Sequence, residues 1–292
     1  MTGYDHFLKL LILIGFIIGG ILLTAAFSFL ILMSSGMSMM EIAQLSDTGM
    51  QELPAGLMRG LLTVQHLSIF ILPGLAFGYV VYKADIWKGL SLSKFPSLGL
   101  IILGIVFLLT AYPIVNLSFL LNESIPLPSW ANDFENQAAE TLKTILQMNS
   151  PIIFLINLLL IAILPGVGEE LLFRGIVQKH IGGWLKNPVV AIWISAFIFS
   201  AIHMQFEGFF PRLCLGAILG YLYYWTNNLW VPIITHAFNN GIQVVLIYSM
   251  DLDLDAFEQE GSDQLQWWMI PLSVAGMYLL YRLIIKNRNV IE

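Results

Sequence analysis

Six polar side chains in the second half of this sequence have the types and spacing that could activate water and receive a developing negative charge. Among them, Glu169 and Glu170 are adjacent, and Arg174 follows Glu170 by four residues. Residues four apart share one face of a helix, so Glu170 and Arg174 can neutralise each other while Glu169 points about 100° away. Glu169 is therefore left without a partner in its own segment and could serve as a general base.

Histidine and asparagine side chains supply the rest of this chemistry. Phe199 and His203 lie four residues apart near the end of an apolar stretch, and His236 and Asn240 have the same spacing inside another. A paired imidazole and carboxamide can either hydrogen-bond a neighbouring helix or stabilise an oxyanion, and the pair alone does not decide between these roles. Taken alone, His203 is more often a packed or interfacial residue.

The segments that carry these residues are apolar enough to lie in a membrane. Hydrophobic residues make up 58% of the 292 residues and charged residues only 11%, and the mean hydropathy is +0.79. A soluble fold of this composition would lack polar surface. Stretches long enough to cross a bilayer recur at about 7–33, 57–82, 98–121, 151–178, 189–206, 209–226, 230–249 and 268–285. Ionisable residues inside such spans are costly and are functional candidates by default.

We therefore expect an all-α fold, a polytopic transmembrane helical bundle of about eight spans. No linker rich in serine, glycine or proline divides the chain, so residues 1–292 are expected to form a single integral membrane domain. The candidate catalytic residues all fall in a core at about 150–250. The first span is too long for a signal peptide and is expected to remain in the mature protein.

The charges between the spans predict the topology. Lysine and arginine gather on the cytoplasmic side of membrane proteins, and ten of the thirteen in this chain fall on one side of an eight-span arrangement. These ten are Lys9, Lys83, Lys88, Lys94, Arg174, Lys179, Lys186, Arg282, Lys286 and Arg288. The opposite loops are acidic, including the stretch 251–263. The sequence thus predicts a multi-pass protein with both termini in the cytoplasm, located in the cell membrane if the host is bacterial.

Charge and cysteine content exclude several other classes of site. The net charge of −6 offers no basic surface for nucleic acid. Cys214 is the only cysteine, which excludes an intrachain disulfide, a zinc knuckle and a cysteine-held iron–sulfur cluster. No metal and no cofactor is expected, and the oligomeric state stays open. His6, His66 and His180 are interpreted as needing no catalytic role, although His66 could line a cavity together with Gln65.

Apolar side chains recur at helical spacing among charged ones over residues 134–146, between the third and fourth predicted spans. This pattern predicts an amphipathic helix at the outer membrane surface. Such a helix is either a packed connection or a lid over a substrate site.

The three spaced sets resemble the motifs of the CAAX-protease and bacteriocin-processing family of intramembrane glutamic endopeptidases. They are Glu-Glu-x-x-x-Arg at 169–174, Phe-x-x-x-His at 199–203 and His-Ala-x-x-Asn at 236–240, in the family's order. The resemblance implies that Glu169 activates water and that His203 helps to bind it. It implies that His236 and Asn240 form the oxyanion hole. The residues expected to support this site are Glu170, Arg174 and Phe199.

Together, residues and resemblance predict metal-independent hydrolysis of a peptide bond, without a covalent intermediate, in a peptide or protein substrate in or at the lipid bilayer. Three alternatives stay open. One is a zinc protease that uses His203, His236 and a carboxylate. The others are a non-proteolytic partner-binding or bacteriocin immunity protein on the same scaffold, and a proton-coupled transporter.

This prediction carries a geometric requirement. If each span ran only from loop to loop, Glu169 would lie toward the cytoplasmic side and His203 toward the outer side, too far apart to share a water molecule. The conflict eases if the helix of Glu169 continues to about His180, because a rise of about 1.5 Å per residue then places Glu169 well inside the membrane. His203 must also lie deep. Pro165 and Gly166 upstream predict a bend in this helix.

Overall fold

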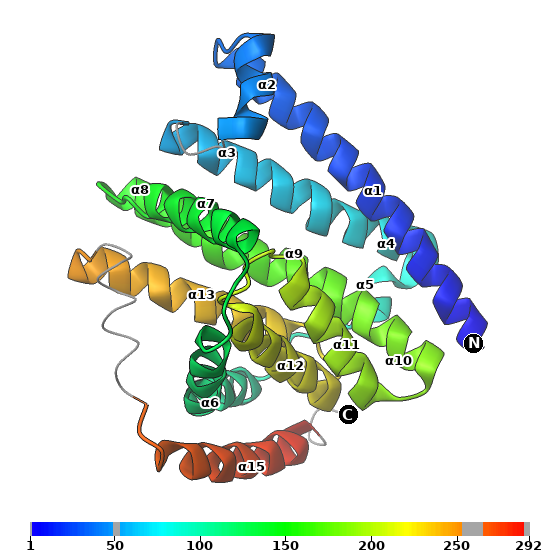
Figure 1. Cartoon of the computed structure of the whole chain (residues 1–292). Coiled ribbons are helices and arrows are strands. Elements are labelled where there is room, and N and C mark those ends of the chain that lie inside the picture. The colour runs from blue at the N-terminus through cyan, green and yellow to red at the C-terminus, as the bar shows by residue number, and fades with distance from the viewer. Residues whose placement is uncertain (1, 49–52, 253–264, 289–292) are drawn as a thin grey trace.

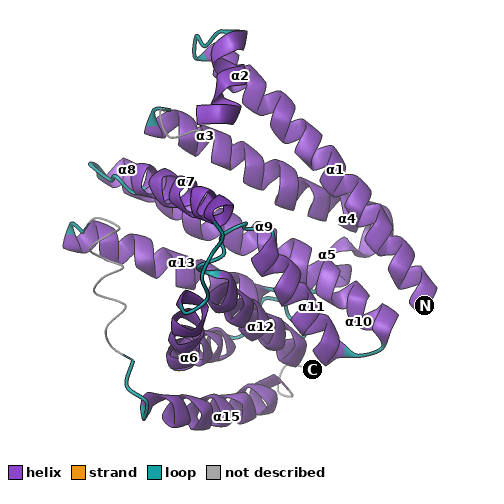
Figure 2. Ribbon diagram, viewed as in Figure 1, coloured by secondary structure: helices purple, strands orange, loops and turns teal. Residues whose placement is uncertain are grey.

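The computed structural model describes residues 2–48, 53–252 and 265–288, and within these ranges every regular element is a helix (Figure 2). The predicted all-α class is therefore confirmed. The α-helices are α1 (Gly3–Ser34), α2 (Met39–Thr48), α3 (Ala55–His66), α4 (Leu72–Tyr82), α5 (Ile86–Gly89), α6 (Leu98–Glu123), α7 (Ser129–Ile145), α8 (Pro151–Asn157), α9 (Leu164–Leu172), α10 (Lys179–Leu185), α11 (Pro188–Ala201), α12 (Phe209–Thr226), α13 (Trp230–Met250) and α15 (Met269–Arg288).

Each predicted span corresponds to a helical segment of the bundle. Six segments in the described part of the chain are long and apolar enough to cross a membrane: Gly3–Ser34, Ala55–Gly89, Leu98–Glu123, Pro151–Leu185, Trp230–Met250 and Met269–Asn287. The other two predicted spans are α11 and α12, which pack against each other. The helix predicted around 134–146 is α7.

The short length of α11 is consistent with the requirement that His203 lie deep in the membrane. Its 14 residues extend about 21 Å, whereas the hydrocarbon core of a bilayer is about 30 Å thick. A helix that starts at one surface therefore ends inside the membrane, and His203 follows its last residue by two positions. Because the Pro151–Leu185 segment is also continuous, as predicted, Glu169 lies near the middle of a long helix.

The two long inner segments, Ala55–Gly89 and Pro151–Leu185, share a local irregularity. A π-helical turn covers Leu67–Ile71 in the first segment and another covers Leu158–Ile163 in the second, and each is followed by Leu-Pro-Gly. Proline has no N–H for the helix ladder, and π turns in α-helices are frequent at functional sites. Upstream of Glu169, where a bend was predicted, the structure has a π turn in an unbroken helix.

The most buried part of the bundle surrounds α9, which contacts α13 and the π turn at 67–71. Close approach depends on glycine here. A Cβ added to Gly166 would lie 3.0 Å from the backbone nitrogen of Ala237 in α13. A Cβ added to Gly216 would similarly lie 3.1 Å from the Cα of Ala196, between α12 and α11. These contacts bring α9, α11, α12 and α13 close enough for their side chains to share one site.

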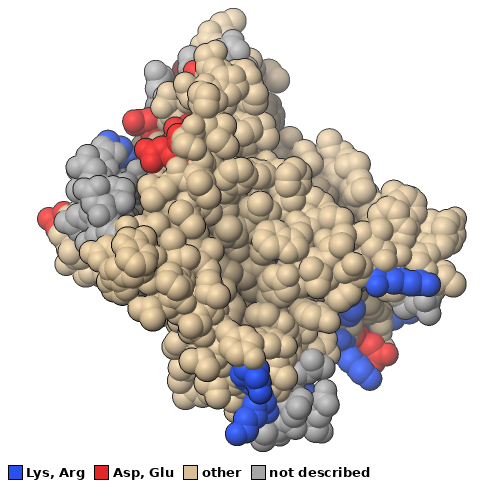
Figure 3. Space-filling model, turned by 60° about the horizontal axis from the view of Figure 1, so that its bottom comes forward, with Lys and Arg blue, Asp and Glu red and all other residues tan. Residues whose placement is uncertain are grey.

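The outer helices have little buried surface, as expected for helices that face lipid instead of water. α1 and α15 form opposite flanks of the bundle (Figure 1), and their apolar side chains are largely exposed. In the view of Figure 3, most lysine and arginine side chains gather at one end, most acidic side chains gather at the other, and an uncharged band separates them. The protein is thus a multi-pass integral membrane protein.

One detail of the predicted charge pattern needs correction. Arg174 was counted among the loop cations, but it lies inside the Pro151–Leu185 segment with 1% of its surface exposed, so it does not report on topology. Most of the acidic stretch 251–263 lies outside the described residues. The first turn of α1 and the last turn of α15 lie on the same side of the bundle in Figure 1. The cytoplasmic position of both termini stays a prediction.

Candidate active site

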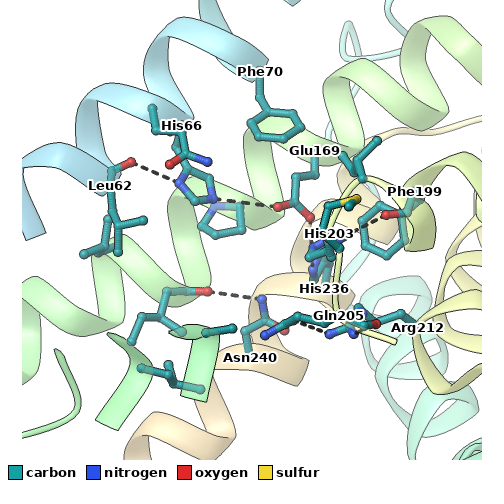
Figure 4. A pocket seen from close by; sticks show the side chains of 18 of the residues that line it. Leu62, His66, Phe70, Glu169, Phe199, His203, Gln205, Arg212, His236 and Asn240 are labelled. Atoms are coloured by element: carbon teal, nitrogen blue, oxygen red, sulfur yellow. Dashed lines mark hydrogen bonds and ion pairs between the residues drawn. The ribbon is translucent and has the colours of Figure 1, made fainter. Parts of the chain in front are cut away.

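A cavity of about 720 Å³ opens in the middle of the bundle, bordered by α3, α6, α7, α9, α11, α12 and α13. The four predicted catalytic residues all line it: Glu169, His203, His236 and Asn240. Figure 4 shows these side chains directed into one space from α9, α13 and the turn after α11. The sequence therefore selected residues that share a cavity, although they are up to 71 positions apart in the chain.

Glu169 is buried, with 5% of its surface exposed, and both of its carboxylate oxygens face histidines. Oε1 lies 3.7 Å from Nε2 of His66, and Oε2 lies 3.9 Å from Nε2 of His236. The expectation that Glu169 lacks a partner thus holds only within its own helix. Its partners come from α3 and α13, a relationship that spacing along one helix cannot reveal.

The pairing predicted between Glu170 and Arg174 is present. Nη1 of Arg174 donates to Oε1 of Glu170 at 2.6 Å, and Nη2 donates to the carbonyl of Gly216 at 2.8 Å. The guanidinium also lies over the ring of Phe199, 4.9 Å from its centroid. Oε1 of Glu170 also contacts Nδ1 of His236 at 2.8 Å. Glu170 therefore connects the cation to the predicted oxyanion hole.

The three cavity histidines share one arrangement: Nδ1 of each ring contacts an oxygen that can only accept. The partners are the carbonyl of Leu62 for His66 at 3.1 Å, the carbonyl of Phe199 for His203 at 2.7 Å and the carboxylate of Glu170 for His236 at 2.8 Å. These partners assign the proton to Nδ1 in every ring. In a neutral ring Nε2 is then an acceptor, available to a water molecule or a ligand.

The carboxamide of Asn240 is oriented by a chain of hydrogen bonds. Its Oδ1 accepts from Nδ2 of Asn239 at 3.0 Å, and Oδ1 of Asn239 accepts from the hydroxyl of Tyr112 at 2.9 Å. Nδ2 of Asn240 donates to the carbonyl of Ile161 at 3.1 Å. That carbonyl lies four residues before Pro165, which has no N–H to offer it. One N–H of Asn240 remains for the cavity.

The turn that carries His203 is anchored from two neighbouring helices. Asn122 donates to the carbonyl of Phe206 at 2.7 Å and accepts from the N–H of Phe210 at 2.8 Å. Arg212 donates at 2.5 Å both to the carbonyl and to the side-chain oxygen of Gln205. These bonds hold the turn after α11, of which residues 202–205 line the cavity, and so fix the position of His203.

Sequence reasoning missed four contributors to this site. His66 was interpreted as needing no catalytic role, yet it contacts Glu169; as an ionisable residue within a span, it met the criterion applied to the other candidates. Arg212, inside the predicted span 209–226, met the same criterion. Asn239 and Tyr112 gave no comparable signal, because the hydrogen bond between them joins separate helices. The helix α7 also borders the cavity, through side chains that include Phe134, Gln137, Ala138, Thr141, Leu142 and Ile145.

Among the described residues, no group of three or more His, Cys, Asp or Glu side chains is arranged to hold a metal ion. The zinc alternative therefore has no preformed ligand cluster in this part of the chain. The contacts of Glu169 with histidine nitrogens, at 3.7 and 3.9 Å, are ion-pair distances.

The candidate site lies in a segment of the chain that matches a known protein family. Residues 151–242 match the family described as type II CAAX prenyl endopeptidase, Rce1-like. This match confirms the family resemblance found in the three spaced sets. It covers α8 to most of α13 and includes every predicted catalytic residue.

Two curated relatives match parts of the chain. The uncharacterized protein YpbD of Bacillus subtilis is 32% identical over 84 residues, which are 27% of this chain and 40% of that protein. The membrane-embedded CAAX protease MroQ of Staphylococcus aureus is 29% identical over 90 residues, 29% of this chain and 36% of that protein. The chain thus aligns with well under half the length of either relative. No solved structure matches it.

Proposed function

We propose that this chain, whose residues 151–242 match the type II CAAX prenyl endopeptidase family, is an intramembrane glutamic endopeptidase. It hydrolyses a peptide bond in or at the membrane without a metal ion. One observation carries the proposal: Glu169, His203, His236 and Asn240 line the same cavity. Burial of so many polar groups inside a membrane bundle is costly, and function is the usual reason for it.

In the proposed reaction Glu169 removes a proton from a water molecule that His203 helps to bind through Nε2. The water oxygen attacks the scissile carbonyl carbon, and the electron pair of the carbonyl moves to its oxygen. When the tetrahedral intermediate collapses, the C–N bond breaks and Glu169 returns its proton to the leaving nitrogen. No covalent intermediate forms between enzyme and substrate, because water is the nucleophile.

The oxyanion is received by Asn240 and His236. Asn240 offers the N–H that does not bond to Ile161. His236 must offer a proton on Nε2 while Nδ1 remains bonded to Glu170, so it acts as an imidazolium. The carboxylate of Glu170, 2.8 Å from Nδ1, supports that charge. Loss of one such donor typically costs about 2.7–4 kcal/mol of transition-state stabilisation.

The cavity suits a peptide in its size and lining. Its volume of about 720 Å³ falls in the range of about 300–1,000 Å³ that ligand sites usually occupy. Apolar side chains from several elements, including α7 and α12, line the wall beyond the polar centre. A non-proteolytic partner-binding or immunity protein would need none of the proton-transfer geometry around Glu169, which is why we favour hydrolysis.

The test is a cleavage assay on purified protein in lipid vesicles, with a pool of apolar peptides and products identified by mass spectrometry. Wild-type cleavage is expected to survive strong chelators. Glu169→Gln keeps the shape of the side chain but removes its basicity, so its rate should fall by about 10²–10⁴-fold. Glu123→Gln, a change at an exposed position at the end of α6, is the matched control and should keep full activity.

Two results would overturn this proposal. Activity lost to a chelator and restored by zinc would identify a zinc protease. A wild-type protein that cleaves no peptide in the pool but binds a membrane partner would favour the non-proteolytic alternative.

A further inference from the structure

His66 belongs to a part of the chain that the family match does not cover. It is the last residue of α3, whereas the match begins at residue 151. Its side chain nevertheless lines the active-site cavity, and its Nε2 lies 3.7 Å from Oε1 of Glu169 (Figure 4). The N-terminal half of the bundle thus contributes a polar group directly to the proposed base.

We propose that His66 is the positioning residue of Glu169: its imidazole, at ion-pair distance from Oε1, fixes the carboxylate so that Oε2 faces the reacting centre. This inference rests on the proposed function for its kinetic consequence, but the pairing itself can be tested separately.

The donor and acceptor atoms at the contact support an attractive pair. Nδ1 of His66 faces the carbonyl of Leu62 at 3.1 Å, and a carbonyl only accepts, so Nδ1 carries a proton. If the ring were neutral and Glu169 ionised, two acceptors would face each other at Nε2 and Oε1. A single proton, on either the ring or the carboxylate, turns this repulsion into an attraction. An attractive contact between these two atoms therefore needs a proton on one of them.

The charge balance of the site points the same way. Arg174 already serves Glu170, at 2.6 Å. The second carboxylate, on Glu169, is also buried, and a buried carboxylate is strongly unfavourable without a partner. His66 and His236 are the two groups within ion-pair distance of Glu169 in the described chain. His236 contacts both glutamates, whereas the ion-pair contact of His66 is with Glu169 alone.

The local structure holds the imidazole in place. The ring lies beside that of Phe70, with centroids 5.6 Å apart, and 17% of the His66 side chain is exposed. The π turn Leu67–Ile71 begins immediately after His66 and contacts α9, the helix of Glu169. A histidine serving only its own helix would need the bond to Leu62 alone. A packing role alone does not explain why Nε2 of His66 faces Glu169 in α9.

The kinetic test compares two substitutions. His66→Phe keeps a ring against Phe70 but removes both nitrogens, whereas His66→Gln keeps a polar group able to reach Glu169. In the peptide assay, kcat of His66→Phe should fall about 100-fold, the size expected when a reacting group is misplaced, with KM changed less than about 2-fold. His66→Gln should recover part of kcat. A kcat of His66→Phe near wild type overturns the proposal.

The pairing test is a melting-temperature cycle that requires no activity. His66→Phe should lower the melting temperature by several degrees, because it leaves Glu169 buried beside one histidine instead of two. Adding Glu169→Gln should then raise it again. His6→Phe, at a histidine that contacts His180 away from the cavity, is the matched control, and its effect should simply add to that of Glu169→Gln.

Additive melting shifts for His66→Phe and Glu169→Gln would overturn the proposal whether or not a substrate is known. If the wild-type protein cleaves no peptide while the cycle shows coupling, the proposed function fails but the His66–Glu169 pair stands.

Discussion

Glu170 holds His236 through a contact of 2.8 Å between Oε1 and Nδ1, which joins α9 to α13 across 66 residues of sequence. The same oxygen accepts from Arg174 at 2.6 Å. Glu169, the neighbouring residue, faces the other nitrogen of the same imidazole at 3.9 Å. Two adjacent carboxylates thus act on opposite edges of one ring, and their substitution should have different effects.

Glu170→Gln is expected to destabilise the protein. It leaves the guanidinium of Arg174 buried without its carboxylate, and an uncompensated buried charge commonly costs about 3–5 kcal/mol. Thermal melting in detergent should show the loss, and turnover should also decline because His236 loses its support. Combining Glu170→Gln with Arg174→Met removes both charges and should recover part of the stability. A stable, folded and inactive Glu170→Gln beside an active Glu169→Gln would reverse the roles of the two glutamates.

Asn240→Ala is expected to lower kcat by about 10²–10³-fold, as removal of an oxyanion donor does elsewhere. Tyr112→Phe should give a smaller decrease in the same direction. It removes the hydroxyl that bonds to Asn239, at 2.9 Å, and so loosens the carboxamide of Asn240 without deleting it. The matched control is Tyr248→Phe, on α13 beyond Asn240, which should be silent. Equal rates for the Tyr112 and Tyr248 variants would refute the proposed relay.

Topology can be checked with single cysteines in a Cys214→Ala background. Lys88 and Asp133 are both exposed, and the loop charges predict that they lie on opposite sides of the membrane. Cysteines introduced at these two positions should react with an impermeant maleimide from opposite sides of sealed vesicles, Lys88→Cys from the cytoplasmic side. Labelling of both from one side would require a different number of crossings between them.

Much of the fold was predictable because it depends on local properties of the chain. Hydropathy over about 20 residues locates a span without reference to its neighbours, and helical spacing alone pairs Glu170 with Arg174. The site was predictable where a spaced set lies on one segment, as with His236 and Asn240.

The sequence alone could not predict the contacts between segments. His66 and Glu169 are separated by about a hundred residues, and only the packing of α3 and the π turn against α9 brings them together. The depth of His203 likewise depends on the short length of α11 and on anchors from Asn122 and Arg212. No periodicity within one helix encodes these relationships.

The carbonyl of Ile161 gives Pro165 an importance beyond bending its helix. An alanine at 165 would place an N–H where that carbonyl could accept it, in competition with Nδ2 of Asn240. Repairing the helix in this way would strengthen the scaffold while it releases the carboxamide that the reaction needs. Engineering for thermal tolerance should therefore spare this proline, since here greater stability and faster turnover make opposing demands on one backbone oxygen.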